Sequence, residues 1–419
     1  MSKLQSLLIT SKNVSRSSYI WNTVSNMLYA FQSVILLTIL TRTVGLVSAG
    51  VFTIAYANAN LFLTIGKFGM RNFHVSDVNR QYTFGEYRLS RIISTIAMIV
   101  VSFGYTIFMS QGNDYSLNKS LILLVMCVFK IPDSYTDVYY GEYQREKRLD
   151  IAAKIMTVRI FVTMVVFAVS VIVSKDLLVA LVLATIVNCI LMYVLTKLTI
   201  SGFTLDFNIR KESVKSLLWN CMPLFVGTFL SFYIGNAPKY AIDSQLSDSL
   251  QACYGFISMP VFVIGLLNGF IFSPIIYKLS WIWSERKTGE FIKRVCLQVA
   301  IVGGITVVCI VGAYILGIPV LSILYNTDLS PYKVELIVLL LGGGFLCLSG
   351  LLNTVITIIR CQKAIFVAYA LVGAAALLLS DSIVASYGMM GAAWLYTGLM
   401  AILSFLFVVI LVVGVVKKK

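Results

Sequence analysis

The sequence is poor in charged residues and contains a single histidine, His74. Only 12% of its 419 residues are Asp, Glu, Lys or Arg, whereas 59% are hydrophobic. Because a typical soluble domain is about half apolar and a quarter charged, a soluble globular protein is excluded. One histidine leaves almost no material for a His-based metal centre or a catalytic triad. We therefore expect no metal site, no catalytic site and no bound cofactor.

Paired cysteines and a nucleotide-binding motif are missing as well. The eight cysteines are scattered, almost all within apolar stretches, and none forms a C-x-x-C pair, so we interpret them as small buried apolar residues. The sequence has no G-x-x-x-x-G-K-[ST] run and no polar stretch long enough for a nucleotide-binding domain, which argues against an ATP-driven pump.

Apolar sequence is abundant, in stretches of about 20 residues that can cross about 30 Å of hydrocarbon as helices. These stretches are too long for the strands of a membrane barrel. The first is also too long for the apolar region of a cleavable signal peptide. The sequence therefore predicts an all-α integral membrane protein with about 12 transmembrane helices. The predicted spans are residues 19–41, 47–66, 91–110, 119–142, 150–173, 176–197, 216–238, 251–277, 293–316, 333–359, 364–385 and 391–416.

Lys and Arg outnumber Asp and Glu by 33 to 18, which gives a formal net charge of +15. When the loops are assigned to alternate sides of the membrane, 26 Lys and Arg residues share a side with both termini and five lie on the other side. The acidic residues divide almost evenly. This is the positive-inside pattern, so we expect cytoplasmic termini, membrane lipids as partners and no nucleic-acid partner.

The polar stretch 201–215 separates two sets of about six predicted helices. We predict an N-terminal bundle at 1–200, a cytoplasmic linker at 201–215 and a C-terminal bundle at 216–419. Both sets begin on the cytoplasmic side, so any internal repeat would be parallel. The run Tyr19-Ile20-Trp21-Asn22 is similar to Leu217-Leu218-Trp219-Asn220, which supports such a repeat.

Two adjacent predicted spans carry charged residues inside the membrane. Lys130, Asp133 and Asp137 are spaced i, i+3 and i+7, which places them on one helix face, and Pro132 between them should bend the helix. The next span carries Lys154 and Arg159. In an antiparallel hairpin Asp137 lies at the depth of Lys154 and Asp133 at the depth of Arg159, whereas Lys130 has no obvious partner. Each ion in the membrane costs about 2.5–3.5 kcal/mol or more, so these residues should face a partner or water.

This charged set has two interpretations. It is either a structural ladder of ion pairs between two helices, or the wall of a central cavity in which Lys130, Arg159 and Lys154 bind an anion. Asp133 and Asp137 alternatively provide a proton or Na⁺ coupling site.

Two further groups are candidates. Arg42, Lys239 and Asp243 flank outer helix ends, where they form a gate or only extend to the membrane interface. Arg42 and Lys239 complete a set of five candidate cavity cations for binding an anionic substrate, and Asp243 is a further candidate for ion coupling or a salt bridge. The run Gly342-Gly343-Gly344 predicts close packing between helices.

Two motifs lie in the first half. One is Leu40-Thr41-Arg42-Thr43-Val44-Gly45 followed by Gly50-Val51-Phe52-Thr53-Ile54-Ala55; the other is the stretch DVYYGEYQREKRLD at 137–150, with Arg159 downstream. They resemble the polysaccharide flippases (Wzx type) of the multidrug/oligosaccharidyl-lipid/polysaccharide exporter superfamily. The family patterns are l-t-R-x-l-G before G-x-y-x-x-a, and an acidic residue, a G-x-x-Q turn and a basic r-l-d run.

The resemblance implies a MATE-like fold with two six-helix bundles around a central cavity, working by alternating access in the bacterial cytoplasmic membrane. The implied cargo is an undecaprenyl-diphosphate-linked oligosaccharide, exported for capsule, teichoic acid or another surface polysaccharide. A glycan polymerase and other assembly proteins are implied partners. Arg42 and Arg159 match basic positions of the family, and a cationic cavity suits a diphosphate.

Two other functions remain open from the sequence. A drug/cation antiporter of the same superfamily would share the fold but should favour an acidic or aromatic cavity. A polytopic membrane enzyme, such as a glycan polymerase, should carry a substantial outer loop with catalytic residues, and the predicted outer loops are short. A scaffold that transports nothing would not need charged residues within its spans.

Overall fold

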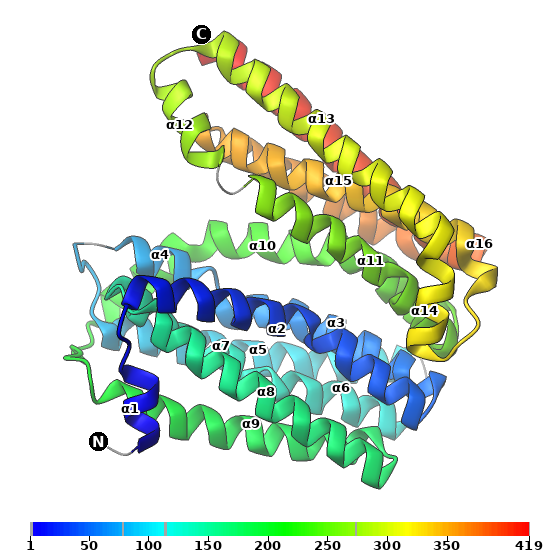
Figure 1. Ribbon diagram of the computed structural model, residues 1–419, viewed down its shortest axis with the longest axis horizontal. Coiled ribbons are helices and arrows are strands. Elements are labelled where there is room, and N and C mark those ends of the chain that lie inside the picture. Colours follow the sequence, from blue (N-terminus) through cyan, green and yellow to red (C-terminus); the bar gives the residue numbers. More distant parts are fainter. Residues whose placement is uncertain (1–2, 78, 113–114, 273–274, 419) are drawn as a thin grey trace. The chain divides into compact units, whose positions relative to one another are not determined.

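In the computed structural model, residues 3–77, 79–112, 115–272 and 275–418 are described, and every regular element among them is helical (Figure 1). The helices up to the predicted linker are α1 (Lys3–Ile9), α2 (Val14–Thr43), α3 (Leu46–Lys67), α4 (Met70–Ser76), α5 (Phe84–Gly112), α6 (Leu117–Phe129), α7 (Ile131–Arg145), α8 (Leu149–Ser174) and α9 (Leu177–Ile200). The others are α10 (Lys211–Gln245), α11 (Asp248–Phe272), α12 (Ile276–Ser284), α13 (Thr288–Gly312), α14 (Ile318–Tyr325), α15 (Lys333–Ile358) and α16 (Gln362–Lys418).

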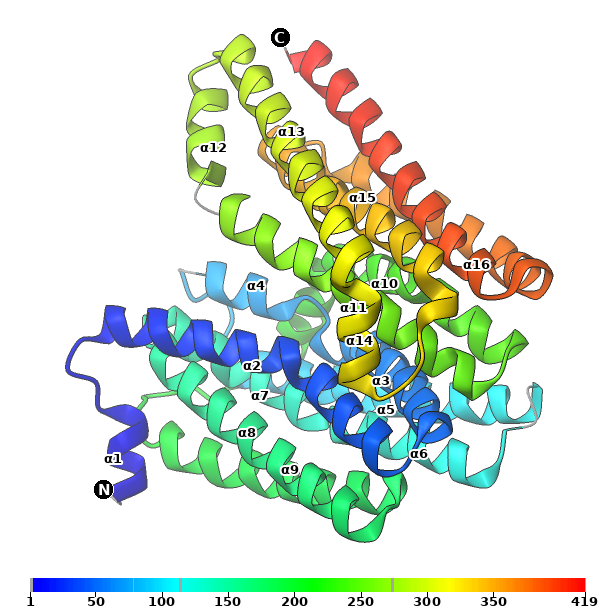
Figure 2. The same ribbon diagram turned by 45° about the vertical axis from the view of Figure 1, so that its right-hand side comes forward.

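Within the described residues, ten helical segments are long and apolar enough to cross a membrane. Two features raise the number of crossings to about twelve, as predicted. The 57 residues of α16 include Gly388 with φ 58°, which divides the helix into two arms (Figure 2). A straight helix of that length would span about 85 Å, far more than one crossing requires. The second feature is that α6 and α7 meet at Lys130 and together form a further crossing.

The chain packs as two compact units, Met1–Phe229 and Leu230–Lys419. The boundary between them falls inside α10. It therefore differs from the linker at 201–215, which was predicted from polarity; the assignment of that linker and of the two six-helix bundles stays a prediction.

In the N-terminal unit, α8 packs against α2 and α9, while α3 packs against α5 and α6. One end of this unit is rich in buried aromatic residues, and leucine and cysteine side chains from the start of α10 join them. The members of this aromatic core include Tyr82, Phe84, Tyr87, Tyr139, Tyr143, Leu217 and Cys221.

In the C-terminal unit, α15 is the central helix and packs against α11, α13 and α16. Its three consecutive glycines face different neighbours. A Cβ atom would lie 2.6 Å from Tyr396 Cδ1 at Gly342, 2.9 Å from Val261 Cγ1 at Gly343 and 2.5 Å from Thr306 Cγ2 at Gly344. The predicted role of these glycines in close helix packing is confirmed.

Candidate functional site

Asp133 and Arg159 form the ion pair that the sequence predicts. Arg159 Nη2 lies 2.5 Å from Asp133 Oδ1, and both side chains are buried between α7 and α8. Arg159 Nη1 donates to Asn188 Oδ1 at 2.9 Å, and the Asn188 amide donates to the Phe129 carbonyl at 3.0 Å. The guanidinium is therefore held by groups from α7 and α9 at the depth where α6 ends.

Lys130 does have a partner, contrary to the prediction. Its ammonium lies 3.4 Å from Asp133 Oδ2 and stands over the rings of Tyr56 and Tyr29, 4.4 and 5.4 Å from their centroids. The side chain is fully buried. Pro132, in the first turn of α7, cannot continue the hydrogen bonding of α6, so the helix breaks at Lys130 as expected and its side chain turns into this aromatic cage.

The predicted pair Asp137–Lys154 is wrong. Asp137 binds the fully buried Arg91 of α5 instead, with Arg91 Nη2 2.8 Å from Oδ2, and Arg71 Nη1 lies 3.5 Å from Oδ1. Arg91 also donates to the carbonyl of Gly66 at 2.8 Å. Equal depth in a hairpin does not fix the rotation of a helix about its axis, so it does not determine which side chains face each other.

Lys154 instead binds the C-terminal end of α1. Its ammonium donates to the carbonyls of Leu7, Leu8 and Thr10 at 3.2–3.3 Å and to Ser11 Oγ at 3.0 Å. Carbonyls in the last turn of a helix have no partners within the helix, and a cation there also complements the helix dipole.

Two buried polar residues near the start of α5 lie outside the candidates that the sequence indicates. Arg91 is the first residue of the predicted span 91–110, whereas α5 begins at Phe84 and buries Arg91 two turns later. The available signal was Thr83-x-x-Glu86, a capping-box spacing that marks the earlier helix start. His74 is buried in α4, with Nε2 2.7 Å from Glu142 Oε2.

The outer candidates belong to different units. Arg42 is exposed in the last turn of α2, whereas Lys239 is half-buried and Asp243 buried in the part of α10 that belongs to the C-terminal unit. Their roles as cargo contacts or as a gate stay predictions.

Taken together, three of the five predicted cavity cations, Lys130, Arg159 and Lys154, are bound by groups of the protein itself. Asp133 contacts both the Lys130 ammonium and one guanidinium nitrogen of Arg159. The arrangement favours the ion-pair interpretation for these residues over a preformed anion site.

No model of a protein family matches the sequence. The chain is 22% identical over 333 residues to the capsular polysaccharide biosynthesis protein CapF of Staphylococcus aureus, a match that covers 78% of this chain and 81% of CapF. Among solved structures it is similar to the lipid II flippase MurJ in an inward closed conformation, with a TM-score of 0.73, 14% identity and coverage of 96% of this chain and 89% of MurJ.

It is also similar to a multidrug resistance MATE family transporter in an inward-facing conformation. The TM-score is 0.64 at 12% identity, over 96% of this chain and 98% of the transporter. At such identities the likeness establishes the fold alone. The predicted MATE-like architecture is confirmed.

Proposed function

We propose that this multi-pass membrane protein, with the fold that MurJ and MATE transporters share, is a flippase for a lipid-linked oligosaccharide. It carries this cargo from the inner to the outer leaflet of the bacterial cytoplasmic membrane by alternating access. The observation that carries the proposal is the combination of two similarities: to a capsular polysaccharide biosynthesis protein over most of the chain, and to a lipid II flippase in fold.

The proposed cargo is an oligosaccharide joined to undecaprenyl through a diphosphate. A diphosphate that enters the membrane requires cationic groups to offset its charge. Lys130, Arg159 and Lys154 are bound by the protein's own groups. We propose Arg42, which is exposed in the last turn of α2, and Lys239 as further candidates for this contact. The basic excess on one side of the membrane supports an orientation with both termini in the cytoplasm.

A drug/cation antiporter is the second candidate, and the similarity to a MATE transporter favours it. Both candidates share a fold, so fold alone does not separate them. The cargo does, because an antiporter expels a soluble cation whereas a flippase moves an anionic lipid.

A deletion strain tests the proposal. Loss of the gene from its bacterium should remove a surface polysaccharide and trap the lipid-linked precursor in the cytoplasmic leaflet, where an impermeant glycosidase added to spheroplasts cannot reach it. Expression of the chain from a plasmid should restore both. A strain with intact surface polysaccharide and increased sensitivity to cationic drugs would contradict the proposal and favour the antiporter.

A further inference from the structure

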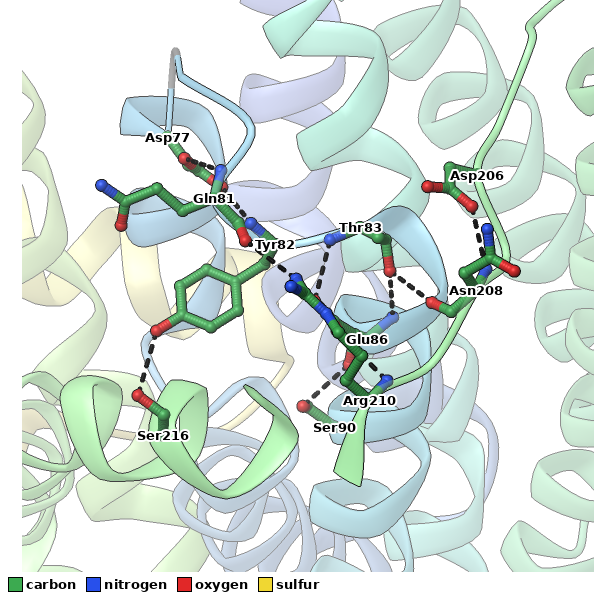
Figure 3. Close-up of polar contacts among 10 residues, drawn as sticks. All are labelled: Asp77, Gln81, Tyr82, Thr83, Glu86, Ser90, Asp206, Asn208, Arg210 and Ser216. Carbon is green, nitrogen blue, oxygen red and sulfur yellow. Dashed lines mark hydrogen bonds and ion pairs between the residues drawn. The ribbon is translucent and has the colours of Figure 1, made fainter. Parts of the chain in front are cut away.

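The segment between α9 and α10, residues 201–210, binds the N-terminal end of α5, and we call it the strap. Its last residue, Arg210, binds the carboxylate of Glu86 (Figure 3). The Glu86 side chain is completely buried. The Arg210 backbone N–H and Nε donate to Glu86 Oε1 at 3.2 and 2.8 Å, and its Nη2 donates to the carbonyl of Gln81 at 3.2 Å. The Glu86 carboxylate raises the pKa of Arg210, which is charged at any physiological pH.

The same carboxylate also orders the start of α5. The Thr83 N–H donates to Glu86 Oε2 at 3.0 Å, and Thr83 Oγ1 accepts from the Glu86 N–H at 3.1 Å, which is the reciprocal capping box. Glu86 thus caps its own helix and holds the strap at once. Release of the strap would remove the cation and the backbone N–H of Arg210 from this carboxylate.

Backbone groups of the strap complete the contact. The Gly85 N–H donates to the carbonyl of Asp206 at 2.9 Å, and the Thr83 hydroxyl donates to the carbonyl of Asn208 at 2.5 Å. The strap approaches so closely that a Cβ atom at Gly85 would lie 2.5 Å from the carbonyl oxygen of Phe207. Only glycine permits this approach.

The first half of α10, which follows the strap, is fixed to the same unit. Tyr82 Oη lies 3.2 Å from Ser216 Oγ and accepts a hydrogen bond from the Asn220 amide at 3.1 Å (Figure 3 shows the first contact). Further along the helix, the ring of Phe225 stacks on Phe68 with centroids 4.5 Å apart. The compact N-terminal unit ends soon after, at Phe229, although α10 continues to Gln245.

We propose that the strap stays bound to α5 throughout the transport cycle and fastens the first half of α10 to the N-terminal unit. Movement of the two units against each other then requires bending within α10 near Gly227, where a Cβ atom would meet no described atom within 4 Å, rather than in the polar linker. This inference rests on the alternating-access part of the proposed function. Glu86 and Arg210 are positioning residues in this scheme, because Arg210 belongs to the strap and Glu86 binds it.

A reversible crosslink tests whether the strap must open. In the variant Thr83→Cys/Asn208→Cys, a short bis-thiosulfonate joins the strap to α5, and polysaccharide export is measured before treatment, after it and after reduction. We expect crosslinking to cause no loss of export. Loss of export that a reductant restores would overturn the proposal, because it would show that the strap has to release. The two single-cysteine variants, treated in the same way, control for the native cysteines.

A second measurement needs no cargo and separates this inference from the proposed function. In detergent, trypsin should cleave slowly after Arg210 or Lys211 in the wild-type chain, because cleavage requires the docked strap to open locally. Gly85→Ala should accelerate that cleavage, whereas Gly104→Ala, in the same helix with open space around it, should not. Equal cleavage rates in both variants would overturn the proposed docking. Absence of oligosaccharide transport by the wild-type chain would instead overturn the proposed function.

Discussion

At the scale of single residues, the main result concerns Asp133, which bridges two buried cations. Arg159 contacts one of its oxygens and Lys130 the other, at 2.5 and 3.4 Å. Loss of the Asp133 side chain should therefore lower the stability of the protein more than loss of Lys130. Removing Lys130 still leaves Asp133 paired with Arg159, whereas removing the carboxylate leaves two buried cations next to each other.

This asymmetry predicts a clear order of stability. Asp133→Asn should destabilise the protein by about 3–5 kcal/mol, the usual cost of breaking a buried ion pair by removing one partner. Lys130→Met keeps a side chain of similar length and its apolar contacts with the tyrosine rings. It should therefore destabilise the protein clearly less than Asp133→Asn. Thermal unfolding of the purified protein in detergent measures both. A cargo-binding Lys130 would instead give a Lys130→Met variant with wild-type stability and no export.

These residues also show how far the sequence could lead. The pair Asp133–Arg159 was predictable because intramembrane ions need partners and the hairpin brought these two to one depth. The true partners of Asp137 and Lys154 were not predictable in this way. Depth does not show which way each side chain faces, and the partners, Arg91 and the end of α1, lie outside the hairpin. The cage around Lys130 depends on two tyrosines from α2 and α3, and no spacing within one hairpin identifies them.

At the scale of elements, the number of helices and their apolar character followed from the sequence, but the breaks in the helices followed only in part. Pro132 indicated the break at Lys130 because proline cannot donate the hydrogen bond that continues a helix. The beginning of α5 is marked by a local capping box, whereas the docked strap depends on contacts between segments more than 100 residues apart, such as Glu86 with Arg210. Local pattern does not carry that information.

The glycines of α15 allow a matched comparison. Gly344→Ala places a methyl group 2.5 Å from the Thr306 side chain of α13, and we expect a loss of about 1–3 kcal/mol from overpacking. Gly350→Ala, on the exposed side of the same helix, should be neutral or stabilise by up to about 1 kcal/mol because alanine favours helix. Thermal unfolding of the two variants checks the order. Equal losses would show that Gly344 has no packing role.

At the scale of the whole molecule, the distribution of basic residues predicts the orientation in the membrane. A reporter fused after Gly112 should lie outside the cytoplasm, and one fused after Leu205 should lie within it. Alkaline phosphatase, active only outside, and a cytoplasm-active fluorescent protein provide the two readouts. The reverse pattern would overturn the proposed topology and place the strap on the outer surface.

The central claim is that the chain moves an anionic lipid-linked sugar between leaflets, and reconstitution tests it most directly. The purified protein is placed in liposomes that contain undecaprenyl-diphosphate oligosaccharide, and an impermeant glycosidase is added outside. Protein-free liposomes should expose only the outer-leaflet share of the sugar. The account predicts that the protein makes the inner-leaflet share accessible as well. An accessible fraction equal to that of protein-free liposomes, with correctly folded protein and with a proton, Na⁺ or voltage gradient supplied, would contradict it.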